Sequence, residues 1–120
     1  MPDWDNTAKD LHRCLEGLFR FSPPTAIIAD EVPHYVAVMQ FCLSRGLRVP
    51  KDVSMVCNDS DSTFGLFESM PARIVWDADP VTRHLLRWAD ELSKGKDMRR
   101  QVVTSSRFMD GGSIGQVLRG

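Results

Sequence analysis

The chain has 120 residues, of which 42% are hydrophobic and 26% are charged, a balance typical of one globular domain with a single core. Lysine and arginine number 15 against 16 aspartate and glutamate residues, so the formal charge of −1 gives the chain itself no electrostatic reason to bind nucleic acid or an acidic membrane. The apolar runs are far shorter than the ~20 residues of a membrane span and the first residues lack the pattern of a signal peptide, so we expect a cytoplasmic protein with no membrane partner.

The first half of the chain predicts a helix, a strand, a second helix and a second strand. Apolar residues recur at helical spacing from Thr7 to Arg20, and Thr7 with Asp10 resembles a capping box. The prolines of FSPP end that helix, and TAIIA indicates a short apolar strand. A largely apolar helix follows, roughly His34 to Arg45, closed by a glycine. The strand VSMVC is continuous in its apolar residues, as in a parallel sheet covered on both faces.

The second half predicts an irregular segment, a strand, a helix and a last strand. NDSDSTFGLFESMP is irregular by composition and RIVW indicates a third strand. The next helix, Asp79 to Lys94, has apolar residues on one side, and QVVTS indicates the last strand. The tail RFMDGGSIGQVLRG is too rich in glycine to carry much structure. The order of elements predicts an α/β fold, a parallel sheet with helices on both faces.

Polar side chains follow three of the predicted strands. The carboxyl ends of parallel strands meet at one edge of the sheet, where α/β proteins bind their ligands. The residues that follow these strands and would gather there are Asp30, Glu31, Asn58, Asp59, Asp61 and Asp77, with Trp76 beside the last of them. Each of the polar residues is also a common turn former, so a turn role explains any single one equally well.

One hypothesis for this edge is phosphoryl transfer. Asp59 would be the nucleophile and Asp61 the general acid, as in the haloacid-dehalogenase-like phosphatases. Those enzymes also need a lysine against the phosphoryl charge and a later acidic pair for magnesium. The acids near Asp77 lack the glycine that precedes such a pair, and the available lysines close a helix instead of following a strand. We therefore do not favour an enzyme.

The other hypothesis is binding without chemistry. Carboxylates and amides hydrogen-bond vicinal hydroxyls, and an indole covers the apolar face of a sugar ring. Trp4, Glu31, Asp59, Trp76 and Asp77 supply both kinds of contact. The three cysteines and three histidines are scattered, without the spacing of a metal site, so we expect neither a metal nor a cofactor.

The segments PPTAIIADE, FCLSRGLRVPKDVSMVCNDSD and ARIVWD resemble the effector-sensing region of the lac repressor and galactose repressor family. The most specific piece, GLRVPKDVSMVCND, resembles the family pattern Gly-Leu-x-Val-Pro-x-Asp-Val-Ser-Val-Val-Gly-x-Asp, and the second acid of NDSD is similar to the xylose-regulator branch. The resemblance extends from Trp4 to Ile114. Cys57 stands where the family has glycine, and Glu31 and Val32 replace its usual Asn-Asp pair.

The resemblance implies a non-catalytic, sugar-responsive part of a bacterial transcriptional regulator. Its fold would be a partial periplasmic-binding-protein type I lobe, a single partial sensing domain over residues 1–120, with the DNA-binding domain and the first lobe absent. Operator DNA would bind only through that other domain. By position, Asp59 corresponds to the aspartate that contacts the sugar in the family, Glu31 to an asparagine after the preceding strand, and Trp4 to an aromatic residue that lines the family's cleft. Asp77 corresponds to the crossing between the two lobes, and Asp61 and Trp76 lie beside these positions. A soluble periplasmic-type sugar-binding protein is the alternative.

Two apolar surfaces predict self-association. Phe64, Leu66 and Phe67 lie in an otherwise polar loop and would be costly to expose, so we expect them at a subunit contact or folded back on the core. In the family the helix from Asp79 to Lys94 packs on the first lobe. Here we expect it to fold onto the sheet or to dock on a second copy, with Asp77 to Pro80 as the hinge.

Overall fold

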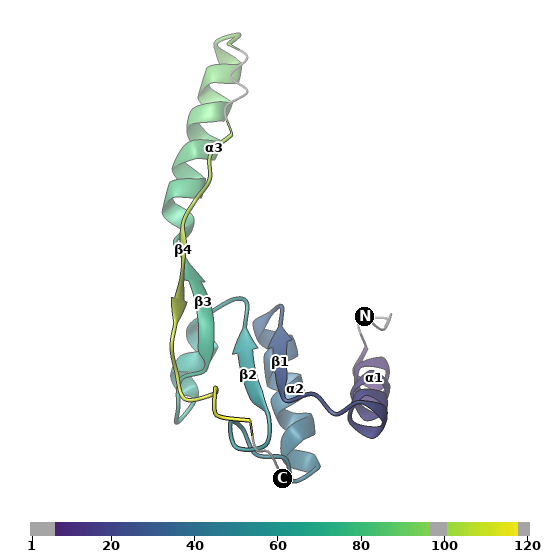
Figure 1. The fold of residues 1–120 in the computed structure, drawn as a ribbon. Helices are drawn as coiled ribbons and strands as arrows, with labels where there is room; N and C mark the ends of the chain where they lie inside the picture. Colours follow the sequence, from purple (N-terminus) through teal and green to yellow (C-terminus); the bar gives the residue numbers. More distant parts are fainter. Residues whose placement is uncertain (1–6, 97–100, 118–120) are drawn as a thin grey trace.

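The computed structural model describes residues 7–96 and 101–117 (Figure 1). The elements in chain order are α1 (Ala8–Phe21), β1 (Ala26–Ala29), α2 (Val32–Ser44), β2 (Ser54–Cys57), the short 3-10 helix η1 (Ser62–Leu66), β3 (Ala72–Trp76), α3 (Ala78–Ser93) and β4 (Ser106–Met109). The predicted α/β class is confirmed, and so is the order of helices and strands up to α3.

The sheet has the order β1-β2-β3-β4. Its first three strands are parallel, as the sequence predicts, but β4 pairs antiparallel with β3, from Arg73 opposite Met109 to Trp76 opposite Ser106. The prediction of a strand at QVVTS is wrong, because residues 101–105 lie outside any strand. A strand forms only where its backbone can hydrogen-bond to a neighbouring strand, and residues 106–109, not residues 101–105, pair with the edge of β3.

The helix ends follow from their local sequences. The Thr7 side chain accepts a hydrogen bond from the Asp10 backbone N–H, which confirms the predicted cap of α1. The second helix begins two residues earlier than predicted, at Val32, with Pro33 in its first turn, where no backbone N–H is needed. Gly46 has a φ of +71°, the left-handed conformation that glycine adopts after a helix.

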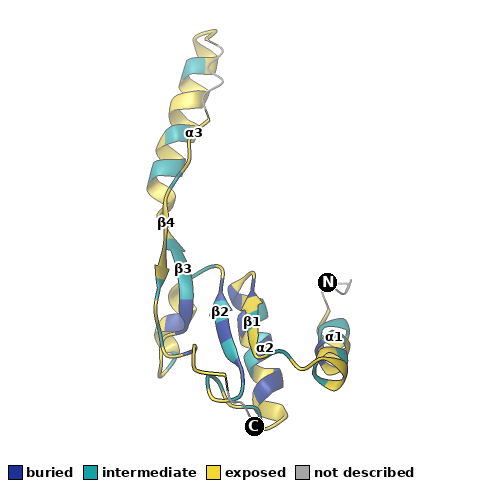
Figure 2. Cartoon of the chain, viewed as in Figure 1, coloured by how far each residue is buried: buried dark blue, intermediate teal, exposed yellow. Residues whose placement is uncertain are grey.

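The core lies between α2 and the β1–β2 half of the sheet. The strand residues that face α2 are covered, and Met55 and Cys57 have no exposed surface. Tyr35 and Phe41 of α2 and Phe64 of η1 fill the remaining space. The opposite face of β1 is open, since Ile28 is 73% exposed (Figure 2).

The glycine-rich tail is ordered against the sheet, so the prediction that it carries little structure is also wrong. The Ser113 carbonyl accepts from the Met55 N–H at 2.9 Å, and its hydroxyl donates to the Met55 carbonyl at 2.5 Å and accepts from the Ala72 N–H at 2.8 Å. Gly111 runs so close to Met70 that an added Cβ would lie 2.2 Å from the Met70 carbonyl oxygen. Glycine is therefore required at this position because a side chain would prevent the two backbone segments from approaching closely, and not for its conformational freedom.

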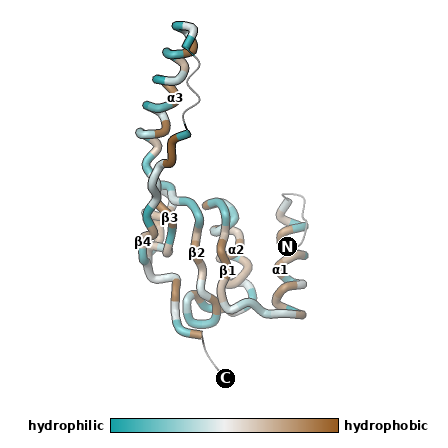
Figure 3. Tube along the Cα trace, turned by 45° about the horizontal axis from the view of Figure 1, so that its top comes forward, coloured by the Kyte–Doolittle hydropathy of each residue, from teal (hydrophilic) through white to brown (hydrophobic). Residues whose placement is uncertain are grey.

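Helix α3 extends away from the sheet, and the returning chain before β4 runs beside it (Figure 1). No residue of this fully described helix is buried. Its apolar residues recur along its length (Figure 3), and Leu85, Leu86, Trp88 and Leu92 are each about half exposed or more. None of the helices in the described residues is long and apolar enough to cross a membrane.

Candidate functional site

The carboxyl ends of β1 and β2 lie at one edge of the sheet, as predicted, and a side-chain hydrogen bond connects the residues that follow them. Ala29 lies opposite Cys57 in the parallel register, so the residues that follow them emerge side by side. The Asn58 amide donates to the Asp30 carboxylate at 3.4 Å, and the Asn58 backbone N–H donates to the Ala29 carbonyl at 2.8 Å. The edge is therefore a connected surface rather than two separate loops.

Asp59 and Asp61 each use one carboxylate oxygen to hold the loop. Asp59 Oδ1 accepts from the Ser60 N–H at 2.8 Å, and Asp61 Oδ1 accepts from the Thr63 N–H at 2.7 Å and caps η1. Within the described residues, the second oxygen of each carboxylate has no hydrogen bond. Asp59 is half-buried and Asp61 is exposed. Both turn roles are thus real, and both still leave an acceptor for a ligand.

A buried thiol lies beneath these carboxylates. Burial raises the pKa of Cys57, and the charges of Asp59, Asp61 and Asp30 raise it further. The thiol therefore stays protonated at neutral pH and is a poor nucleophile. In the two described ranges, no group of three or more histidine, cysteine or acidic residues is arranged to hold a metal ion.

Glu31 precedes α2 as its N-cap residue. Its side chain makes no capping hydrogen bond and is exposed. A glutamate side chain is too long to cap the first turn as well as an asparagine would. Its carboxylate is consequently not required by the helix.

Trp76 and Asp77 lie together in a cavity of about 380 Å³ at the end of β3. Its lining also includes Val75, Ser105 and Arg107. β2 ends at Cys57, opposite Arg73, so β3 continues past it and carries Trp76 beyond the neighbouring strand. Trp76 is 50% exposed, and Asp77 Oδ1 accepts from the Asp79 N–H at 3.0 Å and caps α3.

The sequence places Val75 in the third strand without assigning it to the site, and it misses Ser105 and Arg107 altogether. Both come from the segment that the sequence assigns to a misplaced strand and an unstructured tail. The apolar pair Phe108 and Met109, just before the glycines, is the signal that could have placed β4 correctly.

The structure thus gathers the predicted residues into two groups along one edge. One group, at the ends of β1 and β2, contains Glu31, Asp59 and Asp61, and the other, at the end of the adjacent β3, contains Trp76 and Asp77. Trp4 lies outside the described residues. The role of each of these residues in binding stays a prediction.

The three large apolar residues of the loop after Asp61, namely Phe64, Leu66 and Phe67, divide between the core and the surface. Phe64 is buried, with its ring centroid 5.2 Å from that of Tyr35 and 5.5 Å from that of Phe67. Phe67 is half-buried against the same cluster. Leu66 is 87% exposed and is the residue of the three that remains available for a subunit contact.

Comparisons with known proteins show a matching domain family and several solved structures of similar fold. The profile of the periplasmic binding protein-like domain family matches residues 2–114. The fold is similar to a LacI family transcriptional regulator from Bifidobacterium animalis subsp. lactis, with a TM-score of 0.81, 19% identity, and coverage of 96% of this chain and 43% of that one. Among curated proteins, no relative matches the sequence.

Two further similar structures were solved with small molecules. One is a sugar-binding transcriptional regulator of the LacI family from Escherichia coli, complexed with phosphate (TM-score 0.74, 15% identity, 92% of this chain and 40% of that chain). The other is a LacI family regulator from Arthrobacter in complex with lactose (TM-score 0.73, 19% identity, 93% and 43%). The chain spans about two fifths of the length of these regulators.

Proposed function

Because the chain belongs to the periplasmic binding protein-like domain family, we propose that it forms part of a sensor that binds a small-molecule effector, a sugar, at the carboxyl edge of its sheet. The observation that carries this proposal is the half-buried Asp59 carboxylate. One of its oxygens accepts from the Ser60 N–H, which leaves the other as a possible acceptor for a sugar hydroxyl.

The neighbouring side chains supply the rest of a sugar site. Glu31 offers a carboxylate that its helix does not use, and Asp61 offers one oxygen beyond its capping bond. The exposed indole of Trp76 provides a face for the C–H side of a sugar ring, next to the Asp77 carboxylate. These roles need no cofactor.

The effector would control transcription through the parent protein. The solved proteins of this fold named above are LacI family regulators, two of them described with a sugar or phosphate bound. We propose that this chain is the effector-sensing part of a regulator of that kind, acting in the cytoplasm. Operator DNA would bind through a domain outside this sequence, since the formal charge of −1 gives this chain no electrostatic reason to bind a polyanion.

A soluble periplasmic-type sugar-binding protein is the second candidate. The matching family profile is named for such proteins, and the proposed site would serve either role. Sequence upstream of residue 1 in the gene distinguishes them, because a regulator has a helix-turn-helix there and a transported binding protein has a signal peptide.

Self-association is part of the proposal. Leu66 and the apolar residues of α3 are exposed, and burying each such side chain would contribute about 1.5–3 kcal/mol. We propose that these surfaces contact a second copy of the chain.

The proposed site is tested by nuclear magnetic resonance titration of this chain with xylose, lactose and cellobiose at millimolar concentrations. We expect weak binding that shifts the Trp76 indole and the Asp59 amide, because the resemblance implies that the other wall of the pocket lies outside this chain. Asp59→Ala should weaken that binding by about 1.5–3 kcal/mol, roughly tenfold or more, whereas Glu68→Ala, in the exposed loop beyond, should not. Equal affinities for Asp59→Ala and the unmodified chain would reduce Asp59 to a turn residue.

A further inference from the structure

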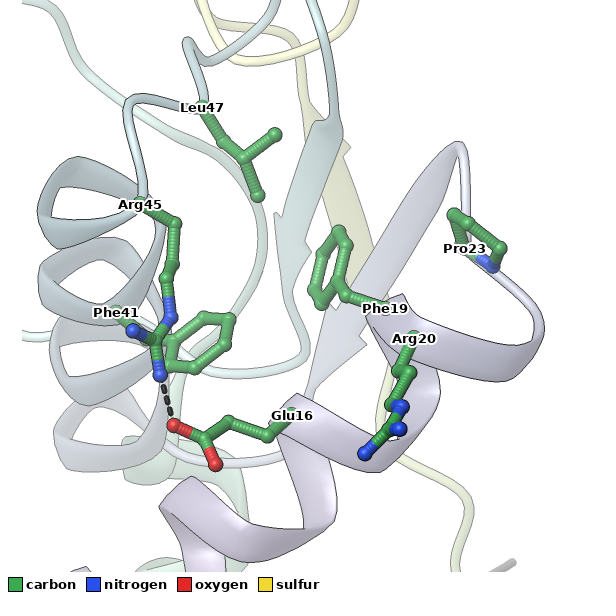
Figure 4. Close-up of a pocket in the computed structure, with 7 residues that line it drawn as sticks. All are labelled: Glu16, Phe19, Arg20, Pro23, Phe41, Arg45 and Leu47. Carbon is green, nitrogen blue, oxygen red and sulfur yellow. Dashed lines mark hydrogen bonds and ion pairs between the residues drawn. The ribbon is translucent and has the colours of Figure 1, made fainter.

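A second cavity lies between the C-terminal halves of α1 and α2 (Figure 4). Its volume is about 550 Å³. The 13 residues of α2 begin directly after the carboxyl end of β1, so the two ends of this helix are ~20 Å apart at 1.5 Å per residue. The cavity lies at the end of α2 that is remote from Asp59 and Glu31, and a ligand there would not touch the proposed effector site.

The walls of this α1–α2 cavity are mainly apolar. Phe19 and Pro23 come from α1 and the turn after it, and Phe41 and Leu47 come from α2 and the loop after it. The ring centroids of Phe19 and Phe41 are 5.7 Å apart with an interplanar angle of 34°. Aromatic and aliphatic walls of this kind accept the flat or extended apolar body of a small molecule.

The lining of the cavity contains two arginines and one glutamate, so one positive charge is not paired with a carboxylate. Arg45 is ion-paired with Glu16, and its guanidinium lies 5.1 Å from the centroid of the Phe41 ring. Arg20 lies four residues after Glu16 on α1, but the Glu16 carboxylate reaches across to α2 instead. Among the described residues, the Arg20 guanidinium lies 5.5 Å from the centroid of the exposed Phe21 ring and has no carboxylate partner. A second carboxylate entering the cavity would therefore meet an unneutralised guanidinium.

We propose that the α1–α2 cavity binds a small organic anion, with its apolar body between Phe19, Phe41 and Leu47 and its carboxylate on Arg20. Three observations support this class of ligand. The volume is in the range of ~300–1,000 Å³ that small-molecule sites occupy. The walls match an apolar body, and the net charge of the lining, two arginines against one glutamate, matches one negative charge.

Other ligand classes fit this cavity less well. A neutral sugar would bring many hydroxyl groups against phenylalanine, proline and leucine, which offer them no hydrogen bonds. A cation would be repelled by the net positive charge of the lining. An acidic peptide would need a longer charged surface than the single arginine left over here provides.

The test uses three probes with the same phenylbutyl body and different head groups, namely 4-phenylbutyrate, 4-phenylbutanol and 4-phenylbutylamine. Each is titrated into this 120-residue chain and followed by the backbone amide signals. We expect the butyrate to bind up to about fivefold more tightly than the alcohol, since an exposed ion pair contributes about 0.2–1 kcal/mol beyond the apolar contact, and the amine to bind most weakly. The signals that shift should be those of Phe19, Arg20, Arg45 and Leu47.

Two arginine variants on the same helix separate the site from general charge attraction. Arg20→Gln should reduce the affinity for the butyrate to that for the alcohol and leave the affinity for the alcohol unchanged. Arg13→Gln removes an equal charge from an exposed position whose partner is Asp10, and should change neither.

Several outcomes would overturn the proposal. Equal affinities for the three probes would show that the negative charge is irrelevant. Shifts confined to α3, or no shifts at all, would place no ligand in the cavity. Binding of an acidic peptide without binding of the butyrate would make this surface a protein contact instead. Because sugars are not used, each result is independent of the effector site proposed above.

Discussion

Ser113 holds together two strands that share few bonds of their own. β2 and β3 pair directly through Val56 with Ala72 and Cys57 with Arg73, and beyond these pairs the tail takes the place of β3 beside Met55. The Ser113 hydroxyl satisfies the Met55 carbonyl and the Ala72 N–H, and both of those residues are fully buried. Ser113→Ala would leave a buried donor and a buried acceptor without their partner.

The cost of that change follows from the two orphaned groups. Each buried polar group left unpaired costs about 1–3 kcal/mol, so Ser113→Ala should lower the free energy of unfolding by about 2–4 kcal/mol once some relaxation is allowed. That is a large share of the ~5–15 kcal/mol that stabilises a small domain. The assay is urea unfolding followed by circular dichroism, with the exposed Ser106→Ala on β4 as the matched control, expected within ~0.5 kcal/mol of the unmodified chain. A loss below ~0.5 kcal/mol for Ser113→Ala would show that the tail is not held as described.

Two further predictions concern pH and assembly. Burial raises the pKa values of Tyr35, Cys42 and Cys57, so the unfolded chain releases these protons at a lower pH than the folded chain does. The free energy of unfolding should therefore be at its full value below the ordinary cysteine pKa of about 8.5 and should fall as the pH rises above it. Urea unfolding at pH 7, 8.5 and 9.5 under reducing conditions would show this fall, and a flat profile would contradict it. For assembly, we expect the chain to sediment as a dimer or larger species. Leu92→Asp on α3, or Leu66→Asp in the loop after Asp61, should reduce that mass. Unchanged masses for both variants would show that these surfaces take no part in a subunit contact.

The strands and helices that could be predicted are those whose residues decide their own conformation. Thr7 caps α1, the apolar run before Cys57 forms β2, and Gly46 ends α2, each by local chemistry that a sequence displays. The edge of the candidate site could be predicted for the same reason, because strand ends and turn formers are visible along the chain. Asp59 and Asp61 occupy the expected loop and also bond to it.

The features that could not be predicted depend on residues far apart in the chain. β4 forms where β3 offers an edge, and Val102 and Val103, which favour a strand by themselves, lie outside it. Ser113 becomes a buried bridge only because the tail returns to Met55 and Ala72, which precede it by 58 and 41 positions in the sequence. Arg107 enters the cavity beside Trp76 through that same antiparallel pairing. Glycine content suggested a loose tail, whereas at Gly111 the missing side chain is what allows close packing.

Asp77 has one observed role and one proposed role, and a pair of substitutions can separate them. It caps α3 through the Asp79 N–H, and it lines the cavity with Trp76 as a proposed acceptor for the effector. Asparagine caps helices as well as aspartate does but carries no charge, whereas alanine does neither. Asp77→Asn should therefore keep the helix content measured by circular dichroism and weaken sugar binding severalfold, and Asp77→Ala should also lower stability by about 0.5–2 kcal/mol. If Asp77→Asn binds sugar as well as the unmodified chain does, Asp77 is a helix cap alone, and the acceptors of the site lie only at the ends of β1 and β2.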